Sequence, residues 1–345
     1  MKQNHATIMK TPFISVIITC HSRKEFLLEA IKSVLAQGLT EELYELVVVK
    51  NFEDPWFDGY LSSIGSKNIL CECVNVGAKI VEGIKHASGE VLCLLDDDDR
   101  FIDSKLSIIY NKFTEDNNLG YYHNSHSVID EKGNQVAGDF VKQSDIQLEL
   151  SSEKGLKKKI VKALRNSTPD FNNSSITMRK EAILPFLDPL SKIKITSDIF
   201  LFTISFLSKK SIIIDNLKLT QYRVHNSSVN ELNDLGSYID RNRIQLKDFV
   251  NAQTLMMSIA QNSDITFYVR YKLLEYNVRY FVFSELKNSK DLLINCLKLI
   301  IYSCIFYSKT NFLLSISAPF TLLSSSFLRK KYYEYFRKKK AQFSL

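Results

Sequence analysis

The sequence predicts an α/β protein, in which a mostly parallel, Rossmann-like sheet flanked by helices is followed by a C-terminal helical region. Three continuous apolar segments, residues 13–20, 45–49 and 90–95, predict strands that are buried on both faces. Helical patterns lie between them. This alternation of strands and helices is typical of a right-handed α/β sheet, which binds its ligands at the carboxyl ends of the strands.

The composition is that of a globular protein whose charge is concentrated at one end. The chain has 345 residues, of which 45% are hydrophobic and 24% charged, and this excludes a disordered or fibrous protein. The formal net charge is +7, but residues 329–340 alone contain seven basic residues and one acidic residue. Since the rest of the chain is nearly neutral, we expect no nucleic-acid partner.

The cysteines and the first residues indicate a reducing, cytoplasmic setting. None of the six cysteines stands in a CxxC pair, and the CxC of Cys71 and Cys73 has no second ligand pair. We therefore predict structural thiols and no zinc site. Residues 1–12 are polar and no secretory signal follows them, so we expect a cytoplasmic protein.

The first half of the chain repeats the strand–helix pattern. Residues 23–37 carry apolar side chains at helical spacing, and Gly38 is placed to end that helix. A second helix is predicted around residues 78–86, before the third strand, and another at residues 105–113. Residues 130–133 are typical of a turn between two short strands.

The second half is less regular. Residues 141–166 are polar and lysine-rich, which favours a mobile helical or loop insertion. Short strands are predicted at residues 174–178 and 211–215, with a helix at residues 198–207 between them. After about residue 230 the pattern is helical and increasingly apolar. We therefore expect an N-terminal extension, a sheet domain and a C-terminal helical region, at residues 1–11, 12–230 and 231–345.

The most informative motif is a run of four aspartates, Asp96 to Asp99, at the end of the third apolar strand. Consecutive carboxylates repel one another, so at the end of a buried strand they need a compensating positive charge. Two or three converging carboxylates suit Mg²⁺ or Mn²⁺, with phosphate oxygens completing the coordination. A solvated acidic turn is the alternative, but the buried strand before it favours a metal–phosphate site.

Three segments together resemble a known family. The start FISVIITCHSR, the strand ASGEVLCLLDDDD and the later YRVHNSS make residues 12–230 similar to a family 2 glycosyltransferase of the GT-A fold. The resemblance implies a nucleotide-sugar donor across the sheet edge, a DxD-type motif that binds the metal on its diphosphate, and inversion at the anomeric carbon. Asp96 would lie near the ribose or the metal, and Asp98 and Asp99 near the metal and the diphosphate. The nucleoside pocket would be lined by Thr19, His21 and Arg23.

Around the second strand the chain departs from the family. The family usually has acidic residues there, one of which contacts the nucleoside, whereas this chain has Lys50 and Asn51. Asn51 can still hydrogen-bond a ribose or a base, so we predict that it contacts the donor, and Lys50 leaves the identity of the nucleotide open. Lys79 falls where the family often has a basic residue near the donor. A surface lysine on a helix is the alternative.

The same resemblance implies a catalytic base at the start of a later helix, where this chain has Asp198 in KITSDIFLF. The preceding residue, usually Glu, is Ser197. One carboxylate suffices to accept the proton of the acceptor hydroxyl during in-line attack. The alternative is that Asp198 caps the helix. Asp170 and Asp215 are further candidates for the base.

Arg223 and His225 occupy alternate positions of the extended segment TQYRVHNSS, so both can face one side. By the resemblance, Arg223 would bind the diphosphate and His225 the metal or a phosphate, which would stabilise the departing nucleotide. A structural role for both is the alternative. His123 and His126 have no partners at ligand spacing, and we assign them no role.

The C-terminal region contains two apolar segments, residues 292–307 and 312–328, each shorter than the about 20 residues that a spanning helix needs. Buried, interfacial and spanning helices all stay open. The basic, tyrosine-rich residues 329–340 favour attachment to a membrane, since basic side chains attract anionic headgroups and aromatic rings lie at the boundary. We expect a protein that is peripheral at the inner face of the cell membrane.

Together these features predict a metal-dependent, inverting glycosyltransferase that moves a sugar from a nucleotide diphosphate donor to a hydroxyl of a glycan or a lipid-linked saccharide. Two alternatives stay open. A nucleotidyltransferase would release pyrophosphate, although no Gly-rich phosphate loop lies near the first strand. A non-catalytic nucleotide- or glycan-binding module on the same fold is supported by Lys50, Asn51 and Ser197.

Overall fold

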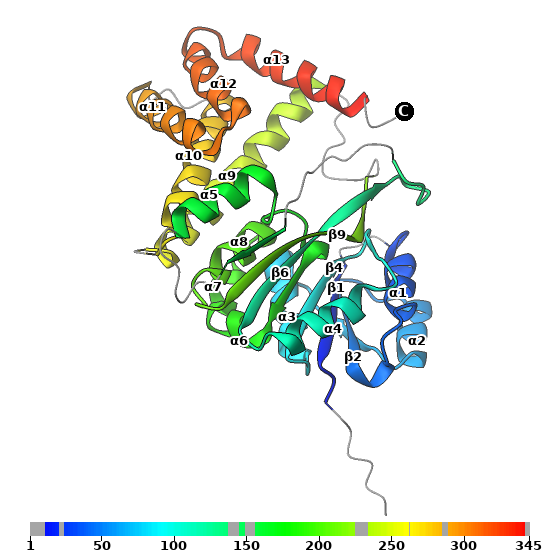
Figure 1. Ribbon diagram of the computed structural model, residues 1–345. Coiled ribbons are helices and arrows are strands. Elements are labelled where there is room, and N and C mark those ends of the chain that lie inside the picture. The colour runs from blue at the N-terminus through cyan, green and yellow to red at the C-terminus, as the bar shows by residue number, and fades with distance from the viewer. Residues whose placement is uncertain are drawn as a thin grey trace, which may run out of the picture.

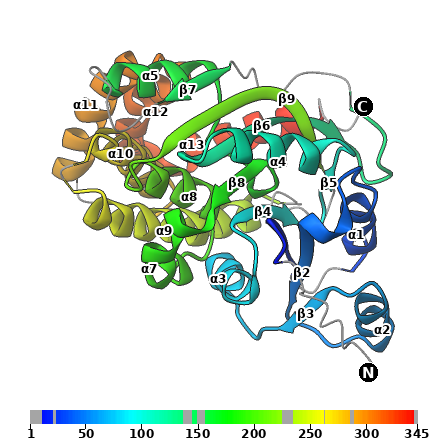
Figure 2. The ribbon, with the colours of Figure 1, turned by 60° about the horizontal axis from the view of Figure 1, so that its bottom comes forward.

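A nine-stranded mixed sheet carries the first two thirds of the molecule, and a group of helices follows it (Figure 1). The computed structural model describes residues 11–20, 24–136, 145–148, 156–224, 234–261, 263–284 and 289–341. The strand order is β3-β2-β1-β4-β8-β6-β9-β5, and β7 pairs with β9. Figure 2 shows the sheet rising from β3 and β2 to β6 and β9.

The parallel part of the sheet is built from the predicted apolar segments. It contains β1 (Ile14–Thr19), β2 (Tyr44–Lys50), β3 (Lys67–Leu70) and β4 (Val91–Asp96). Alternate residues of β1 enter two separate cores, with Ile17 packing on one face and Ile18 on the other. Because both faces are covered, the strand is apolar at nearly every position. The last residue of β1, Thr19, is paired with Asp96 at the end of β4.

The remaining strands are β5 (Arg100–Phe101), β6 (Leu119–Ile129), β7 (Ile146–Leu148), β8 (Ile176–Arg179) and β9 (Ser211–Arg223). β8 is antiparallel to both β4 and β6, whereas β9 runs parallel to β6. β9 has 13 residues, far more than the predicted strand at residues 211–215, and it carries the chain back toward the end of β4. The fold class predicted from the sequence is confirmed.

Helices cover the sheet on both sides. They are α1 (Leu27–Leu35), α2 (Pro55–Ser63), α3 (Val76–His86), α4 (Lys105–Glu115), α5 (Leu156–Asn166), α6 (Lys180–Ile183), α7 (Leu187–Ser191) and α8 (Ser197–Ser205). α2 and β3 were not predicted. Residues 156–166 of the lysine-rich segment form the helix α5, whose buried residues are Ile160 and Ala163.

The C-terminal region is a bundle of five helices, α9 (Leu235–Ile259), α10 (Thr266–Phe283), α11 (Ser289–Phe306), α12 (Lys309–Ser317) and α13 (Thr321–Ala341). α10 packs against α9, α11 and α13. In both views α11 and α12 lie at the end of the molecule away from α2 (Figures 1 and 2). Within the described ranges, no helix combines the length and the apolar character needed to cross a membrane.

One expectation for side chains is wrong, and a second stays a prediction. Cys71 and Cys73, predicted as free structural thiols, are joined by a disulfide, since the chain turns just after β3 and brings their Cα atoms within 5.1 Å. The tyrosines of the basic tail were expected at a membrane boundary, yet Tyr332 packs beside Phe283 and Tyr333 beside Tyr238. These two rings face the bundle because α13 lies along α9 and α10. Of the tail's basic and aromatic side chains, those beyond Glu334 lie outside the description.

Candidate functional site

The aspartate run forms a tight turn at the carboxyl end of β4. The amide of Asp99 donates to the carbonyl of Asp96 across the turn, at 3.3 Å. Asp97 and Asp99 are buried, whereas Asp96 and Asp98 are partly accessible. Thr19 stands next to Asp96 in the β1–β4 register, as expected for two residues at one edge of a parallel sheet.

The carboxylates of this turn lack sufficient positive charge. Burial, together with the neighbouring carboxylates of Asp98, Asp99 and Asp97, raises the pKa of Asp96 well above its usual value. Burial and the charge of Asp98 raise the pKa of Asp99 to about 8. Asp99 Oδ2 is buried and has no hydrogen-bond partner among the described residues. A cation at this edge would therefore be attracted strongly.

Arg223 lies behind the acidic turn and is fully buried. Its Nε donates to the carbonyl of Asp98 at 2.8 Å, its backbone amide donates to Asp99 Oδ1 at 2.9 Å, and its Nη2 pairs with Glu29 Oε2 at 2.6 Å. Because these groups already occupy the guanidinium, the geometry does not favour its predicted contact with a diphosphate. Arg223 holds the shape of the turn, and Glu29, which the sequence did not single out, holds Arg223.

A second buried cation lies beneath the turn. Lys105, the first residue of α4, is completely buried, and its ammonium donates to the carbonyl of Ser174 at 2.5 Å and to Thr220 Oγ1 at 3.1 Å. Burial lowers the pKa of Lys105 to about 8. No sequence signal marked this residue, since a lysine at a helix start is ordinarily solvated.

The segment Asn172–Ser174 connects the acidic turn to Asp198. The Asn172 amide donates to Asp198 Oδ2 at 3.1 Å, and Asn172 has φ +68°, which an asparagine tolerates better than most residues. The Asn173 side-chain amide lies 3.4 Å from Asp96 Oδ1, and its carbonyl accepts from Ser197 Oγ at 3.0 Å. Ser174 Oγ accepts from the amide of Asp96 at 3.0 Å. The asparagine pair ahead of β8 was the available signal for this segment.

Asp198 is the second residue of α8, and the N-cap position belongs to Thr196. Its carboxylate is half-buried and accepts from the amides of Ile199, at 2.8 Å, and Asn172. Burial raises the pKa of Asp198 to about 6, with a further contribution from the negative charge of Asp170. A carboxylate with this pKa is ionised at neutral pH and more basic than an ordinary aspartate.

The two other candidates for the base have cationic partners. Asp170 pairs with Lys272 of α10 at 3.0 Å and accepts a hydrogen bond from Tyr268. Burial alone would raise the pKa of Asp170, but the Lys272 charge and these hydrogen bonds hold it below its usual value. Asp215 pairs with Lys112 at 3.0 Å and accepts from the Tyr122 hydroxyl at 3.0 Å. The pKa of Asp198 is therefore raised, whereas that of Asp170 is lowered.

The expected donor residues around β2 lie at the same edge of the sheet. Lys50 is buried, and its ammonium pairs with Asp58 at 2.8 Å. The carboxylate of Asp58 therefore offsets the positive charge of Lys50 at this edge of the sheet. Asn51 follows it and is partly accessible. Lys79 is buried and donates to the carbonyl of Cys20 at 2.9 Å, so it supports the end of β1 from below.

Three predicted site residues, His21, Arg23 and His225, lie outside the described residues. Between the described parts of the site, three aromatic rings form a cluster: His126, Phe171 and Tyr222 have ring centroids 5.4 to 5.6 Å apart. Burial raises the pKa of Tyr222, and the negative charges of the acidic turn and of Asp198 raise it further. Burial lowers the pKa values of His123 and His126 to about 4, so both are neutral.

No group of three or more His, Cys, Asp or Glu side chains converges as a complete metal cage within the described ranges. The residues nevertheless fit a Mg²⁺ or Mn²⁺ ion in part. Asp96 and Asp98 provide accessible oxygen ligands, and Mg²⁺ usually keeps water and substrate phosphate oxygens in the rest of its shell. The predicted ligand Asp99 is turned inward, toward the amide of Arg223.

A mostly parallel sheet with an acidic turn at the carboxyl end of β4 defines a protein of the GT-A fold, the class predicted from the sequence. Residues 15–184, nearly half of the chain, match the family described as Glycosyl transferase family 2, which confirms the expected resemblance to this family.

The curated relatives match only part of the chain. A segment of 134 residues is 34% identical to an uncharacterized glycosyltransferase of Rickettsia conorii, and one of the same length is 32% identical to another of Rickettsia felis. The first match covers 36% of this chain and 20% of the relative, so the chain spans about a fifth of the relatives' length.

Solved structures are similar over most of the chain. S. aureus TarS 1–349 in complex with UDP has a TM-score of 0.57 at 16% identity, with 93% of this chain and 91% of the TarS 1–349 chain covered. The same protein in complex with UDP-GlcNAc has a TM-score of 0.54 at 15% identity over the same shares. At these identities the similarity establishes the fold.

Proposed function

We propose that the chain is an inverting, metal-dependent glycosyltransferase in which Asp198 is the catalytic base. One observation carries this proposal: a single hydrogen-bonded segment, Asn172–Ser174, ties the base to the acidic turn. The carboxylate that would deprotonate the acceptor and the carboxylates that would hold the donor end are therefore positioned by the same three residues.

The proposed reaction is a single displacement. The oxygen of the acceptor hydroxyl attacks the anomeric carbon from the face opposite the diphosphate, while Asp198 takes the hydroxyl proton. A carbon–oxygen bond forms to the acceptor as the bond from the anomeric carbon to the diphosphate oxygen breaks. The nucleoside diphosphate leaves with that electron pair, and the configuration at the anomeric carbon is inverted.

The acidic turn would hold a divalent cation for this departure. Asp98 and Asp96 are the residues that would bind it, and Arg223 and Lys105 fix the turn from behind and below. A bound Mn²⁺ or Mg²⁺ would offset the negative charge that develops on the diphosphate. The raised pKa values of Asp96 and Asp99 support a site that is built for a cation.

For the donor, uridine diphosphate sugars are the first to test, because the similar fold of TarS was solved with UDP and with UDP-GlcNAc. Thr19 and Asn51 lie at the ends of neighbouring strands, where a nucleoside would be bound. We further propose a glycan or a lipid-linked saccharide as acceptor. The sheet domain would extend from about residue 12 to about residue 230, and the helical region would follow it. Through this C-terminal region the protein would be located at the inner face of the cell membrane.

The proposal is tested by comparing Asp198→Asn with the parent chain. UDP release from UDP-GlcNAc with Mn²⁺ and a panel of glycan acceptors should fall about 10²- to 10⁴-fold, the usual contribution of a general base. The shift in Tm on adding UDP should be unchanged, because the base does not bind the nucleotide. Asp188→Asn is the matched control, since Asp188 is an exposed aspartate paired only with the exposed Lys192.

Three results would contradict the proposal in different ways. Full turnover by Asp198→Asn would move the base to Asp170. Pyrophosphate released from a nucleoside triphosphate would make the chain a nucleotidyltransferase. If the chain binds a nucleotide sugar but neither transfers the sugar to any acceptor nor hydrolyses the donor, it is a binding module.

A further inference from the structure

One face of α11 is apolar and exposed along its whole length. Leu293, Leu297, Ile301 and Ile305 follow one another at intervals of four residues, which places them on the same side of the helix. Their exposed fractions are 45%, 64%, 62% and 41%. The opposite side of α11, which includes Leu292, Cys296 and Leu299, is buried in the bundle.

Helix α12, which packs against α11, also exposes apolar side chains. Here the exposed apolar residues are Phe312, Leu313 and Ile316. We call these seven side chains the α11–α12 face. A soluble monomer rarely exposes so many contiguous large apolar side chains unless they contact a partner.

A basic helix borders this face. α5 contains four lysines and one arginine and no acidic residue. Its Arg165 donates from Nε to the carbonyl of Ile305 at 2.9 Å, and its guanidinium lies 3.6 Å from the centre of the Tyr307 ring. The helix is thereby joined to the end of α11, and Lys158 and Lys162 are exposed beside it.

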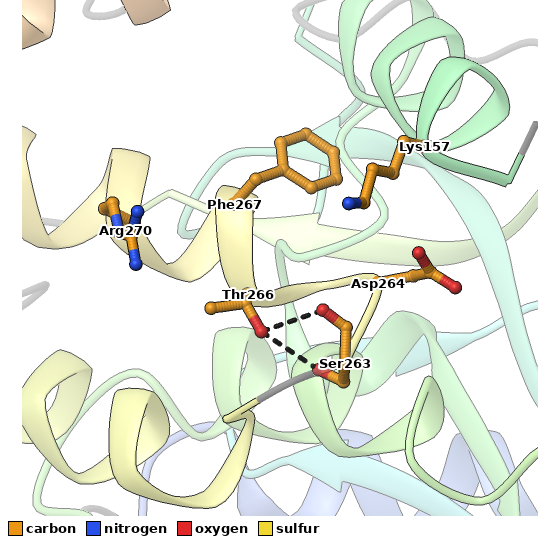
Figure 3. Close-up of a pocket in the computed structure, with 6 residues that line it drawn as sticks. All are labelled: Lys157, Ser263, Asp264, Thr266, Phe267 and Arg270. Carbon is orange, nitrogen blue, oxygen red and sulfur yellow. Dashed lines mark hydrogen bonds between the residues drawn. The ribbon is translucent and has the colours of Figure 1, made fainter.

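A cavity of about 350 Å³ lies at the junction of α5 and α10 (Figure 3). Figure 3 shows Lys157 reaching from α5 toward Phe267, with Arg270 on the next turn of α10; Asp264 also lines the cavity. Phe267 stacks on Phe306, at the end of α11, with centroids 5.8 Å apart. Of the predicted donor and metal residues that the structure describes, none lines this cavity; the stacking of Phe267 on Phe306 joins the cavity to the end of α11.

We propose that the α11–α12 face and the lysines of α5 form a docking surface for an anionic lipid membrane. The inference deepens the membrane partner proposed above and rests on it, but it does not depend on sugar transfer. Apolar side chains enter the headgroup boundary and basic side chains bind anionic headgroups, which is the pattern of an interfacial helix. The surface therefore differs from the basic tail to which the sequence pointed.

A second copy of the chain is a poorer occupant than a lipid surface. A two-fold contact through the α11–α12 face would bury the apolar side chains, because the patch would face its own copy. It would not supply an anionic partner for the lysines at its border from α5, since α5 contains no acidic residue. An anionic bilayer matches both the apolar face and the charge of its border.

The test is flotation of the purified full chain with two kinds of vesicle, phosphatidylcholine alone and phosphatidylcholine mixed with phosphatidylglycerol. The parent should float only with the anionic vesicles. Leu297→Asp/Ile301→Asp should lower the partition coefficient at least about 100-fold, because two buried apolar side chains are lost. Lys158→Glu/Lys162→Glu should lower it at least about 30-fold, as expected for two basic side chains at an anionic surface.

Matched controls carry the same chemical changes elsewhere. Ile244→Asp alters an isoleucine of α9 that is also 62% exposed, and Lys32→Glu/Lys247→Glu makes the same change of net charge on α1 and α9. Both should float like the parent. Equal flotation of the parent and the test variants overturns the proposal. A second contradicting result is a parent that does not bind vesicles but forms a dimer, detected by analytical ultracentrifugation, which Leu297→Asp/Ile301→Asp dissociates. If vesicle binding is absent but UDP still raises the Tm, the docking surface is wrong and the transferase proposal stands.

Discussion

The sheet edge and the C-terminal helices differ in what they leave uncompensated. At the end of β4, four carboxylates lie close together, and burial and their mutual repulsion raise the pKa values of Asp96 and Asp99. On α11 and α12, large apolar side chains outnumber the charged ones on the exposed side and meet water. Each arrangement costs stability in the isolated chain, since buried charge and exposed apolar surface are both unfavourable.

The contrast indicates what kind of partner each region binds. Excess negative charge at a strand end calls for a cation and a phosphate-bearing ligand. An excess of apolar surface bordered by lysines calls for a lipid boundary. Asp170 shows the third possibility, a carboxylate that the protein has already compensated with Lys272. The following predictions separate these cases, from the largest expected effect to the smallest.

Removal of the cation should have the largest effect. In the presence of EDTA, or in Asp98→Ala with Mn²⁺, sugar transfer should fall at least about 1000-fold, equivalent to ~4 kcal/mol of transition-state stabilisation. The measurement is UDP release from UDP-GlcNAc before and after Mn²⁺ is restored. Full activity in EDTA would show that the acidic turn acts without a metal.

Lys105→Met should destabilise the sheet domain. It removes the buried ammonium that donates to the carbonyl of Ser174 and to Thr220 Oγ1 below the acidic turn, and loss of a hydrogen bond from a charged group costs about 2 kcal/mol. The measurement is the free energy of unfolding by urea. Lys32→Met, on the exposed side of α1, is the control and should change it by less than about 0.5 kcal/mol. Equal stability of the two variants would mean that Lys105 is not needed under the turn.

The pH profile should respond to α10. Transfer by the parent should decline as the pH falls through about 6, because Asp198 then takes up a proton and no longer acts as a base. The positive charge of Lys272 lowers the pKa of Asp198, so Lys272→Met should move this limb to higher pH, by about 1 unit. Lys272→Arg should restore the original midpoint. If the acid limb of the pH profile stays at the same pH in Lys272→Met, Lys272 does not influence the pKa of the base.

The smallest effect is expected on the stability of the helical region. Leu297→Asp should change the free energy of unfolding in the absence of lipid by less than about 0.5 kcal/mol, because the side chain is 64% exposed. Urea denaturation of both chains measures this. A loss of about 2 kcal/mol or more would mean that Leu297 packs inside the protein and that the α11–α12 face is not a free surface.

The sequence predicts the parts of the fold in which one pattern dominates. β1, β2 and β4 were predicted because both faces of each are covered and apolar residues are continuous. Of β6, only a short strand before the turn at residues 130–133 was predicted, because its buried positions include His123 and Asn124, whose side chains are satisfied by Phe171 and Thr220 from other segments. β3 was missed because it is a short edge strand that is only half-buried.

The candidate site divides in the same way. The aspartate run and Asp198 are visible in the sequence because their chemistry depends on residue type and on position relative to a strand or a helix. Arg223, by contrast, was expected to meet the donor, and only the tertiary arrangement reveals that its donors are occupied by Asp98, Glu29 and the turn after β6. Lys105 and the Asn172–Ser174 segment likewise depend on contacts between residues far apart in the chain.

Helix α10 has a mechanical consequence that follows from its two sides. Tyr268 and Lys272 contact Asp170 near the proposed base, while Phe267 and Arg270 line the cavity beside α5. These four residues lie within two turns of one helix, and a helix is stiff over that distance. A tilt of α10 would therefore move the Lys272 ammonium and the lining of the cavity together. The ion pair with Asp170 and the junction with α5 share one support.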